Sequence, residues 1–220
     1  MAKFLVTGAN RGIGLELCRQ LKERGDEVLA VCRQISSELD VLNATVIDGI
    51  DVATADGVER LAAAISGQSL DAIVHNAGIL RRDRLDSINY DDMLEQFRVN
   101  TLGPLRVTEA LLHSLASGGK VAIVTSRMGS MADNGSGGYY GYRVSKAAVN
   151  MIGVSLARDL ESRGISVALL HPGMVATEMT GGNGIPVDVS ARGLIGRIDA
   201  MTLANSGSFW HAPDNAELPW

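Results

Sequence analysis

Cysteine is scarce in this sequence of 220 residues, in which only Cys18 and Cys32 occur. Two cysteines cannot build a disulfide framework, and their separation does not match the spacing of a zinc site. The four histidines show no ligand spacing either, so we expect no metal site. This composition is typical of a protein of the reducing cytoplasm.

Long hydrophobic runs and basic clusters are also missing. No stretch reaches eighteen consecutive apolar residues, and the N-terminal residues lack the succession of charged, apolar and small residues of a signal peptide. The net charge is −5, and the 20 lysines and arginines form no run that could follow a phosphate backbone. We therefore expect a soluble, cytoplasmic protein with neither a membrane nor a nucleic acid as partner.

Proline is rare, with 5 residues, whereas glycine is abundant, with 25. The combination excludes collagen-like and disordered chains and indicates glycine-rich loops in a folded unit. The length fits one mid-sized domain, so we expect residues 1–220 to form a single domain.

Short apolar runs alternate with longer amphipathic stretches along the chain. Most of the runs are apolar throughout, as in strands that are covered on both faces of a parallel sheet. Helical spacing of apolar residues, as at Ile13, Leu17 and Leu21, marks the stretches between them. The pattern predicts an α/β fold of the Rossmann type, a doubly wound parallel sheet of about seven strands with helices on both faces. Strands are expected at residues 4–7, 28–32, 45–47, 72–75, 121–125, 167–171 and 208–211.

Two intervals depart from the regular alternation. Only about ten residues, 34–43, separate the second and third strands, so a short helical turn must replace a full crossover helix there. After Thr177 the chain is rich in glycine and then forms an amphipathic segment over residues 187–203. We expect a short substrate lid around residues 178–203, its glycine-rich part being mobile.

The first expected strand leads into a glycine motif, Gly8-Ala9-Asn10-Arg11-Gly12-Ile13-Gly14. Glycines allow close approach of the backbone, and the N-terminus of the following helix offers free N–H groups to a pyrophosphate. A glycine-rich turn without a ligand is the alternative interpretation. The position of the motif, in the first strand-to-helix turn of a doubly wound chain, favours a dinucleotide.

The second strand indicates which dinucleotide is bound. Enzymes that use NAD usually place an acidic residue after this strand, whereas here the chain reads Cys32-Arg33-Gln34. Arg11 stands in the first turn of a helix, where the macrodipole disfavours a cation unless an anion is near. A 2′-phosphate between Arg11 and Arg33 satisfies both observations, so we expect NADP(H) rather than NAD(H). Either arginine alone is also compatible with a solvated surface position.

Further motifs complete a pattern that extends over nearly the whole chain. They are Asn76-Ala77-Gly78, Asn100, Ser126, Tyr142-Arg143-Val144-Ser145-Lys146 and Pro172-Gly173-Met174-Val175-Ala176-Thr177. With the glycine motif, they resemble the classical short-chain dehydrogenase/reductase family. The run from Tyr139 to Lys146 and the closing Leu218-Pro219-Trp220 are most similar to the sniffer and C-factor branch, which includes carbonyl reductases.

The resemblance assigns the acid/base role to Tyr142 and a supporting role to Lys146, which also binds the nicotinamide ribose. The two residues are four apart, on one face of a helix. A lysine charge at about 5 Å and an effective dielectric of ~20 supplies roughly 3 kcal/mol, or some two pKa units. We therefore expect Lys146 to lower the pKa of Tyr142 toward neutrality. An exposed packing pair is the alternative for this spacing alone.

Two further catalytic positions follow from the resemblance. Ser126 is expected to bind the substrate oxygen and Tyr142, although Thr125 and Ser130 are neighbouring hydroxyls. Asn100 lies in a helical stretch expected over residues 91–115, and the family's asparagine there holds a water of a proton relay. Because Pro104 has no N–H, it cannot bond the carbonyl of Asn100, and the helix should kink at this point. Without the resemblance, Ser126 could be an ordinary turn residue, and the carbonyl of Asn100 could be bound by solvent at a proline kink.

The resemblance also implies which residues contact the cofactor. Asp51 would contact the adenine, the residues after the fourth strand would line the cofactor, and the loop after the sixth strand would hold the nicotinamide. The full set is Gly8, Asn10, Arg11, Gly12, Ile13, Gly14, Arg33, Asp51, Asn76, Ala77, Gly78, Tyr142, Lys146, Pro172, Gly173, Val175 and Thr177.

These features favour an NADPH-dependent carbonyl reductase that also oxidises the alcohol in reverse. The glycine-rich part of the lid, residues 179–186, carries no charged residue except Glu178 at its start, so a small, largely uncharged carbonyl is expected as substrate. A homodimer or homotetramer is implied by the family. A dinucleotide-binding signalling protein is an alternative, although it would not need Ser126, Tyr142 and Lys146. An epimerase or dehydratase would need a larger C-terminal substrate domain and is less favoured.

Overall fold

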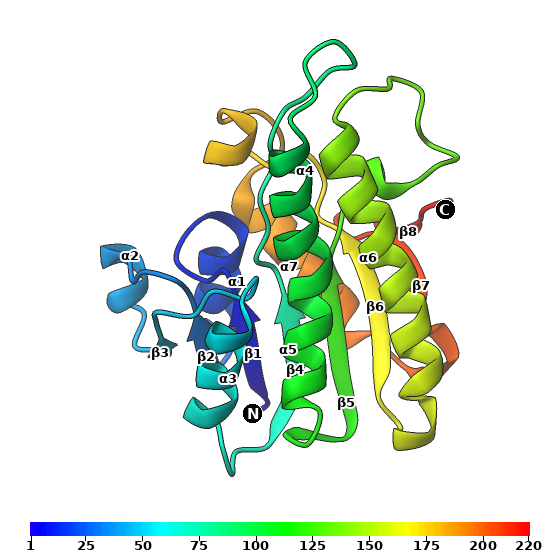
Figure 1. Ribbon diagram of the computed structural model, residues 1–220. Helices are drawn as coiled ribbons and strands as arrows, with labels where there is room; N and C mark the ends of the chain where they lie inside the picture. The colour runs from blue at the N-terminus through cyan, green and yellow to red at the C-terminus, as the bar shows by residue number, and fades with distance from the viewer.

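The computed structural model describes residues 1–220 and contains one eight-stranded sheet of strand order β3-β2-β1-β4-β5-β6-β7-β8 (Figure 1). All neighbouring pairs are parallel except β7 with β8. The doubly wound fold predicted above is confirmed. The strands are β1 Lys3–Thr7, β2 Glu27–Val31, β3 Thr45–Ile47, β4 Leu70–His75, β5 Leu115–Val124, β6 Ser166–His171, β7 Ser208–His211 and β8 Ala216–Glu217.

Helices cover both faces of this sheet. The α-helices are α1 Gly12–Glu23, α2 Ser37–Asp40, α3 Ala55–Ala64, α4 Tyr90–Phe97, α5 Gly103–Leu111, α6 Tyr140–Asp159 and α7 Val187–Asp199. Alternation along the strands separates two cores: Phe4 and Val6 pack with α1 and α7, whereas Leu5 packs with α3, α5 and α6. Because both faces of each central strand are buried, the strands are apolar throughout.

The prediction from the sequence omitted one strand and placed the end of one helix too far along the chain. β8 has only two residues and runs antiparallel to β7, so no periodicity marks it. The helical stretch expected over residues 91–115 ends at Leu111, because Leu115 already pairs with Leu70 in the sheet. It is also divided by a π-helix, Arg98–Leu102. The short crossover was predicted correctly: α2 has four residues, and Ser36 caps it by accepting a hydrogen bond from the Leu39 N–H.

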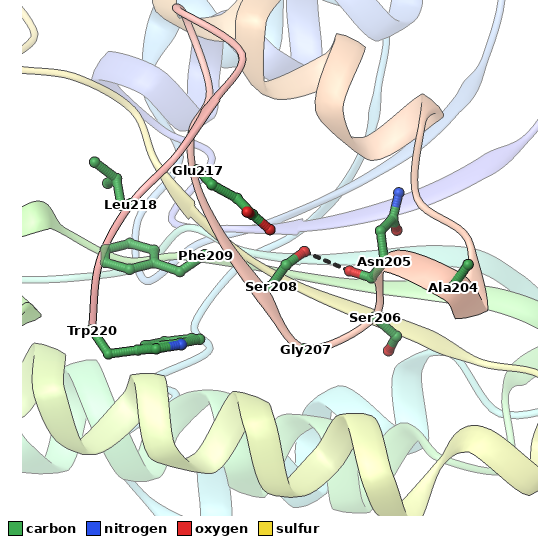
Figure 2. Close-up of a pocket in the computed structure, with 9 residues that line it drawn as sticks. All are labelled: Ala204, Asn205, Ser206, Gly207, Ser208, Phe209, Glu217, Leu218 and Trp220. Carbon is green, nitrogen blue, oxygen red and sulfur yellow. Dashed lines mark hydrogen bonds between the residues drawn. The ribbon is translucent and has the colours of Figure 1, made fainter.

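The C-terminal residues close the edge of the sheet, as Figure 2 shows. The rings of Phe209 and Trp220 stack with centroids 5.4 Å apart, and the Trp220 carbonyl accepts a hydrogen bond from Ala132 N. A cavity of about 370 Å³ lies there, lined by residues 204–209, Glu217, Leu218 and Trp220. It contains none of the expected site residues. A two-residue outer strand is a common way to protect a sheet edge.

None of the helices combines the length and the apolar character that a bilayer crossing requires. No group of three or more histidine, cysteine or acidic side chains is arranged to hold a metal ion.

Candidate active site

The glycine motif forms a tight cradle between β1 and α1. Gly8 and Gly12 have positive φ angles of 67° and 54°, which side-chain-bearing residues rarely adopt. A Cβ on Gly14 would lie 2.2 Å from the Gly8 carbonyl oxygen, so only glycine fits there. No side chain caps the N-terminus of α1, and no acidic residue stands in its first turn. This cradle, with free N–H groups at its floor, fits the pyrophosphate of a dinucleotide.

The end of β4 is tied directly to this cradle. The Asn76 side chain donates to the carbonyls of Thr7 and Gly8, at 3.1 Å each. In return, the Thr7 hydroxyl accepts from the backbone N–H groups of Asn76 and Ala77, also at 3.1 Å. Thr7 was not among the expected site residues, although it directly precedes the glycine motif. These bonds hold the two strand ends that the cofactor would cross.

The two arginines expected to share a phosphate have different surroundings. Arg11 forms an ion pair with Glu178 in the loop after β6. Arg33 is exposed at the end of β2, and no carboxylate pairs with it. Asp51 lies nearby, because Ile50 N bonds the Cys32 carbonyl, but its carboxylate accepts from Ala53 N at 2.9 Å. Of the two arginines, Arg33 is therefore the one whose guanidinium group has no carboxylate partner and can bind an anion.

Ser126, Tyr142 and Lys146 come together at the carboxyl end of β5. Ser126 lies within reach of the Tyr142 hydroxyl and lowers its pKa, and the Lys146 Nζ lies 5.7 Å from the centre of the Tyr142 ring. All three residues are buried. The neighbouring hydroxyl of Thr125 instead donates to Asn150 at 2.7 Å, and that of Ser130 accepts from Asp133 N. Of the three hydroxyls considered, Ser126 is thus the one that faces Tyr142.

The expectation that Lys146 lowers the pKa of Tyr142 toward neutrality is wrong for this structure. Burial raises the pKa of Tyr142 to about 12, and this effect exceeds the lowering by the hydrogen bond from Ser126. Burial also lowers the pKa of Lys146 to about 8. The ammonium group donates to the Val124 carbonyl at 3.0 Å. The spacing correctly places Lys146 Nζ near the Tyr142 ring, but it could not give the desolvation that raises the pKa of the phenol.

Asn100 lies within the π-helix that interrupts the α4–α5 rod. Pro104 predicts a kink at this point, and the structure has a π-helical turn, Arg98–Leu102, in place of a continuous α-helix. The Asn100 side chain is fully engaged: it accepts from Ile79 N at 2.8 Å and donates to Ile79 O and Ser145 Oγ. A Cβ on Gly78 would lie 3.3 Å from Asn100 Oδ1 and 3.7 Å from Lys146 Nζ. Both side chains thus lie close to Gly78.

The loop after β6 lies against the glycine cradle. A Cβ on Gly12 would touch Thr177 Cγ2 at 3.4 Å, and the ion pair between Arg11 and Glu178 spans the same gap. The glycine-rich segment is held by hydrogen bonds that join Ile185 to Met174 and Ala176. The second part of the expected lid is α7, a helix that buries Leu194 and Ile198 in the core.

At the start of this loop, the Pro172 carbonyl accepts from the Ser190 hydroxyl of α7 at 2.7 Å. Gly173 has a positive φ angle of 85°. Val175 is buried and forms an isolated bridge with Ile185. The loop and α7 therefore support each other beside the cradle.

No histidine takes part in this constellation. His75 is buried and bonded to Thr108, and burial lowers its pKa to about 3. His171 is half-buried and packed edge-on against His211, and desolvation lowers its pKa to about 3. Both side chains are therefore neutral at pH 7.

Asp83 is a site residue that sequence reasoning missed. It stands in the loop between β4 and α4, yet its carboxylate accepts from the backbone N–H groups of Tyr140 at 2.5 Å and Gly141 at 2.9 Å. It thereby caps the N-terminus of α6, two residues before Tyr142. The Asp83 carbonyl also accepts from Tyr139 N. No local pattern reveals a cap that comes from a point 57 residues away.

Removing this cap should loosen the first turn of α6. We expect Asp83→Asn to destabilise the protein by about 1 kcal/mol and Asp83→Ala by about 2 kcal/mol, measured as the urea midpoint of unfolding. Asparagine loses the charge and one acceptor, whereas alanine loses both acceptors. Asp86→Asn is the matched control, since exposed Asp86 contacts only Ser87, at 3.4 Å. Equal midpoints for all three variants would show that the cap contributes nothing.

Comparisons with known proteins agree with this geometry. The sequence model of the family described as short chain dehydrogenase matches residues 2–185. A 1-hydroxy-2-glutathionyl-2-methyl-3-butene dehydrogenase of Rhodococcus sp. is 46% identical, with 100% of both chains covered. The C-signal protein of Myxococcus xanthus is 44% identical over 69% of this chain and 93% of its own.

Solved structures of carbonyl reductases are similar to this chain over its full length. The NADPH-bound carbonyl reductase from chicken fatty liver superposes with a TM-score of 0.92 at 28% identity, covering 100% of this chain and 99% of that one. The carbonyl reductase Sniffer of D. melanogaster also has a TM-score of 0.92, at 27% identity and full coverage of both chains. The predicted likeness to the sniffer and C-factor branch is confirmed. This chain belongs to the short-chain dehydrogenase family.

Proposed function

We propose that this protein is an NADPH-dependent carbonyl reductase in which Tyr142 is the general acid and base. The observation that supports it most is the buried trio Ser126, Tyr142 and Lys146, which lies beside a glycine cradle shaped for a dinucleotide. The bound nicotinamide would supply the hydride that reduces the carbonyl carbon. The protein must then bind the oxygen and give it a proton.

The protonation states suit reduction at pH 7. With a pKa of about 12, Tyr142 is a neutral phenol that can donate its proton to the substrate oxygen. Ser126 holds that oxygen and stabilises the charge that develops on it. Lys146, with a pKa of about 8, is mostly charged. Its positive charge, with Nζ 5.7 Å from the centre of the Tyr142 ring, would favour the tyrosinate left behind.

The remaining residues would position the cofactor. The N-terminus of α1, with Gly8, Asn10, Arg11, Gly12, Ile13 and Gly14, would hold the pyrophosphate, and Asn100 would hold a water of the proton relay next to Lys146. Asp51, Asn76, Ala77, Pro172, Gly173, Val175 and Thr177 would line the remainder. Arg33 is proposed as the main partner of the 2′-phosphate, because Arg11 already pairs with Glu178. NADP-bound carbonyl reductases among the structural neighbours support this choice.

The Rhodococcus relative extends the proposal to the reverse reaction. Its name describes oxidation of an alcohol that carries a glutathionyl group, and oxidation uses the same residues with Tyr142 as base. We propose that this chain likewise interconverts a carbonyl and an alcohol, and that a bulky polar substituent is tolerated. The C-signal relative leaves a signalling protein with little turnover as the alternative.

The test is NADPH oxidation, followed by absorbance, with a panel of aldehydes, ketones and quinones, repeated with NADH. We expect turnover with NADPH and a much lower kcat/KM with NADH. In Arg33→Asp, NADPH affinity should fall about 10- to 100-fold, while NADH affinity should hold or improve, because an acid can bond the ribose hydroxyls. Tight NADPH binding without reduction of any carbonyl would favour the signalling alternative. An unchanged cofactor preference would refute the role of Arg33.

A further inference from the structure

A second cavity opens between the β4–α4 loop and the β5–α6 loop, the two loops that rise at the top of Figure 1. Its volume is about 640 Å³. Both loops start from segments of the active site: one follows Gly78, and the other leads into α6. The lining residues are Arg82, Asp83, Arg84, Leu85, Ser87 and residues 136–140. We call this space the Arg82–Arg84 cavity.

The charge in this cavity is unbalanced. Arg81, just outside it, pairs with Glu95 and Asp92, but no carboxylate pairs with Arg82 or Arg84. Asp83 is the one acidic residue of the lining, and its carboxylate is occupied by the N–H groups at the start of α6. Two guanidinium groups therefore remain free on one wall. Guanidinium groups bind carboxylates through paired, planar hydrogen bonds.

The opposite wall is formed by residues 136–140 and is fixed in shape. Arg143 of α6 donates to Ser136 Oγ at 2.8 Å and to the carbonyls of Gly137 and Gly138. Tyr139 adopts the left-handed conformation with φ of 53°, which is unusual for a residue with a side chain. This conformation persists because Asp83 holds the Tyr139 N–H. The wall thus presents Tyr139 and Tyr140 as a preformed, partly apolar surface.

The cavity is close to the proposed proton donor. The two loops that line it are anchored at the active site: one follows Gly78, where a Cβ would lie 3.7 Å from Lys146 Nζ, and the other leads from Ser126 to the start of α6, two residues before Tyr142. Asp83, which stands between the two arginines, contacts the Gly141 N–H at 2.9 Å.

We propose that the Arg82–Arg84 cavity binds a carboxylate group of the substrate while the substrate carbonyl lies at Tyr142. This inference rests on the proposed reductase function and names its substrate class: carbonyl compounds, and the corresponding alcohols, with an acidic substituent several bonds from the reacting carbon. It replaces the small uncharged carbonyl expected from the lid, because the charged recognition residues lie on a different loop.

The experiment uses two aldehydes that differ only in charge, 4-(4-formylphenyl)butanoate and the corresponding primary amide. We expect the wild type to prefer the acid, and raising the salt from about 0.05 to about 0.5 M should weaken that preference. In the double variant Arg82→Gln/Arg84→Gln, the ratio of kcat/KM for acid over amide should fall about tenfold, mainly through KM. Arg60→Gln is the charge-matched control, since exposed Arg60 pairs with Asp56 within α3, a helix that lies away from both loops in Figure 1.

Equal losses for acid and amide, or an unchanged ratio, would overturn the inference. A separate binding measurement distinguishes its failure from failure of the proposed function. Calorimetric titration with 4-phenylbutanoate, which has no carbonyl to reduce, should show binding to the wild type and about tenfold weaker binding to the double variant. If neither aldehyde is reduced but this difference persists, the cavity is a carboxylate site and the reductase proposal fails. Equal or absent binding in both proteins refutes the site.

Discussion

Tyr142→Phe should lower kcat for carbonyl reduction by about 10²- to 10⁴-fold, the range typical for removal of a general acid. The phenyl ring keeps the buried volume and loses only the hydroxyl that bonds Ser126, so the fold should persist. NADPH affinity should change little, since most of the proposed cofactor contacts lie elsewhere. The measurement is steady-state kinetics together with a fluorescence titration of NADPH.

Tyr90→Phe is the control for this experiment. Tyr90 is 72% exposed at the start of α4, and the loss of its hydroxyl should leave kcat unchanged. If Tyr142→Phe retains more than half of the wild-type kcat, Tyr142 is not the proton donor. A parallel loss of NADPH binding would instead indicate a disturbed cradle.

Gly14→Ala should disrupt the cradle, although alanine is the better helix former. The new Cβ would lie 2.2 Å from the Gly8 oxygen and 2.4 Å from Asn76 Nδ2, so the glycine loop and its bond to Asn76 must move. We expect a loss of about 1–3 kcal/mol in the free energy of unfolding. We also expect NADPH affinity to fall by at least tenfold, because the N–H groups at the start of α1 shift.

Gly196→Ala is the matched substitution in another helix, with an expected effect of opposite sign. Gly196 is an exposed residue of α7, and nothing lies within 4 Å of a Cβ built there. The variant should gain about 0.5–1 kcal/mol from helix propensity alone, with unchanged NADPH affinity. Urea unfolding measures the change in stability of both variants, and a titration with NADPH measures their cofactor affinity. A Gly14→Ala protein as stable and as NADPH-competent as the wild type would show that the cradle is loosely packed.

The features that could be predicted from the sequence are those set by local pattern. Apolar runs predict the seven parallel strands, because strands that are buried on both faces consist mostly of apolar residues. Pro104 predicts the break in the α4–α5 rod, since a missing N–H has a direct structural effect. The spacing of Tyr142 and Lys146 correctly places both side chains at one site, because it equals about one helical turn.

The features that could not be predicted depend on contacts between distant segments. The ion pair of Arg11 with Glu178 joins two loops that are 167 residues apart. The cap of α6 likewise joins residues that are far apart in the sequence, Asp83 and Tyr140. The pKa of Tyr142 depends on how deeply the ring is buried, and burial is a property of the packed molecule rather than of residue spacing.

The central place of β1 in the sheet has a consequence for folding during synthesis. Val6 pairs with Ala30 on one side, 24 residues away, and with Val74 on the other, 68 residues away. Closing the longer loop costs about 1 kcal/mol more in chain entropy, so β1 should pair first with β2. At typical translation rates, β4 leaves the ribosome roughly 2 to 9 s after β2. During that interval the nascent chain exposes an apolar, unpaired strand edge, which is the state that chaperones protect from aggregation.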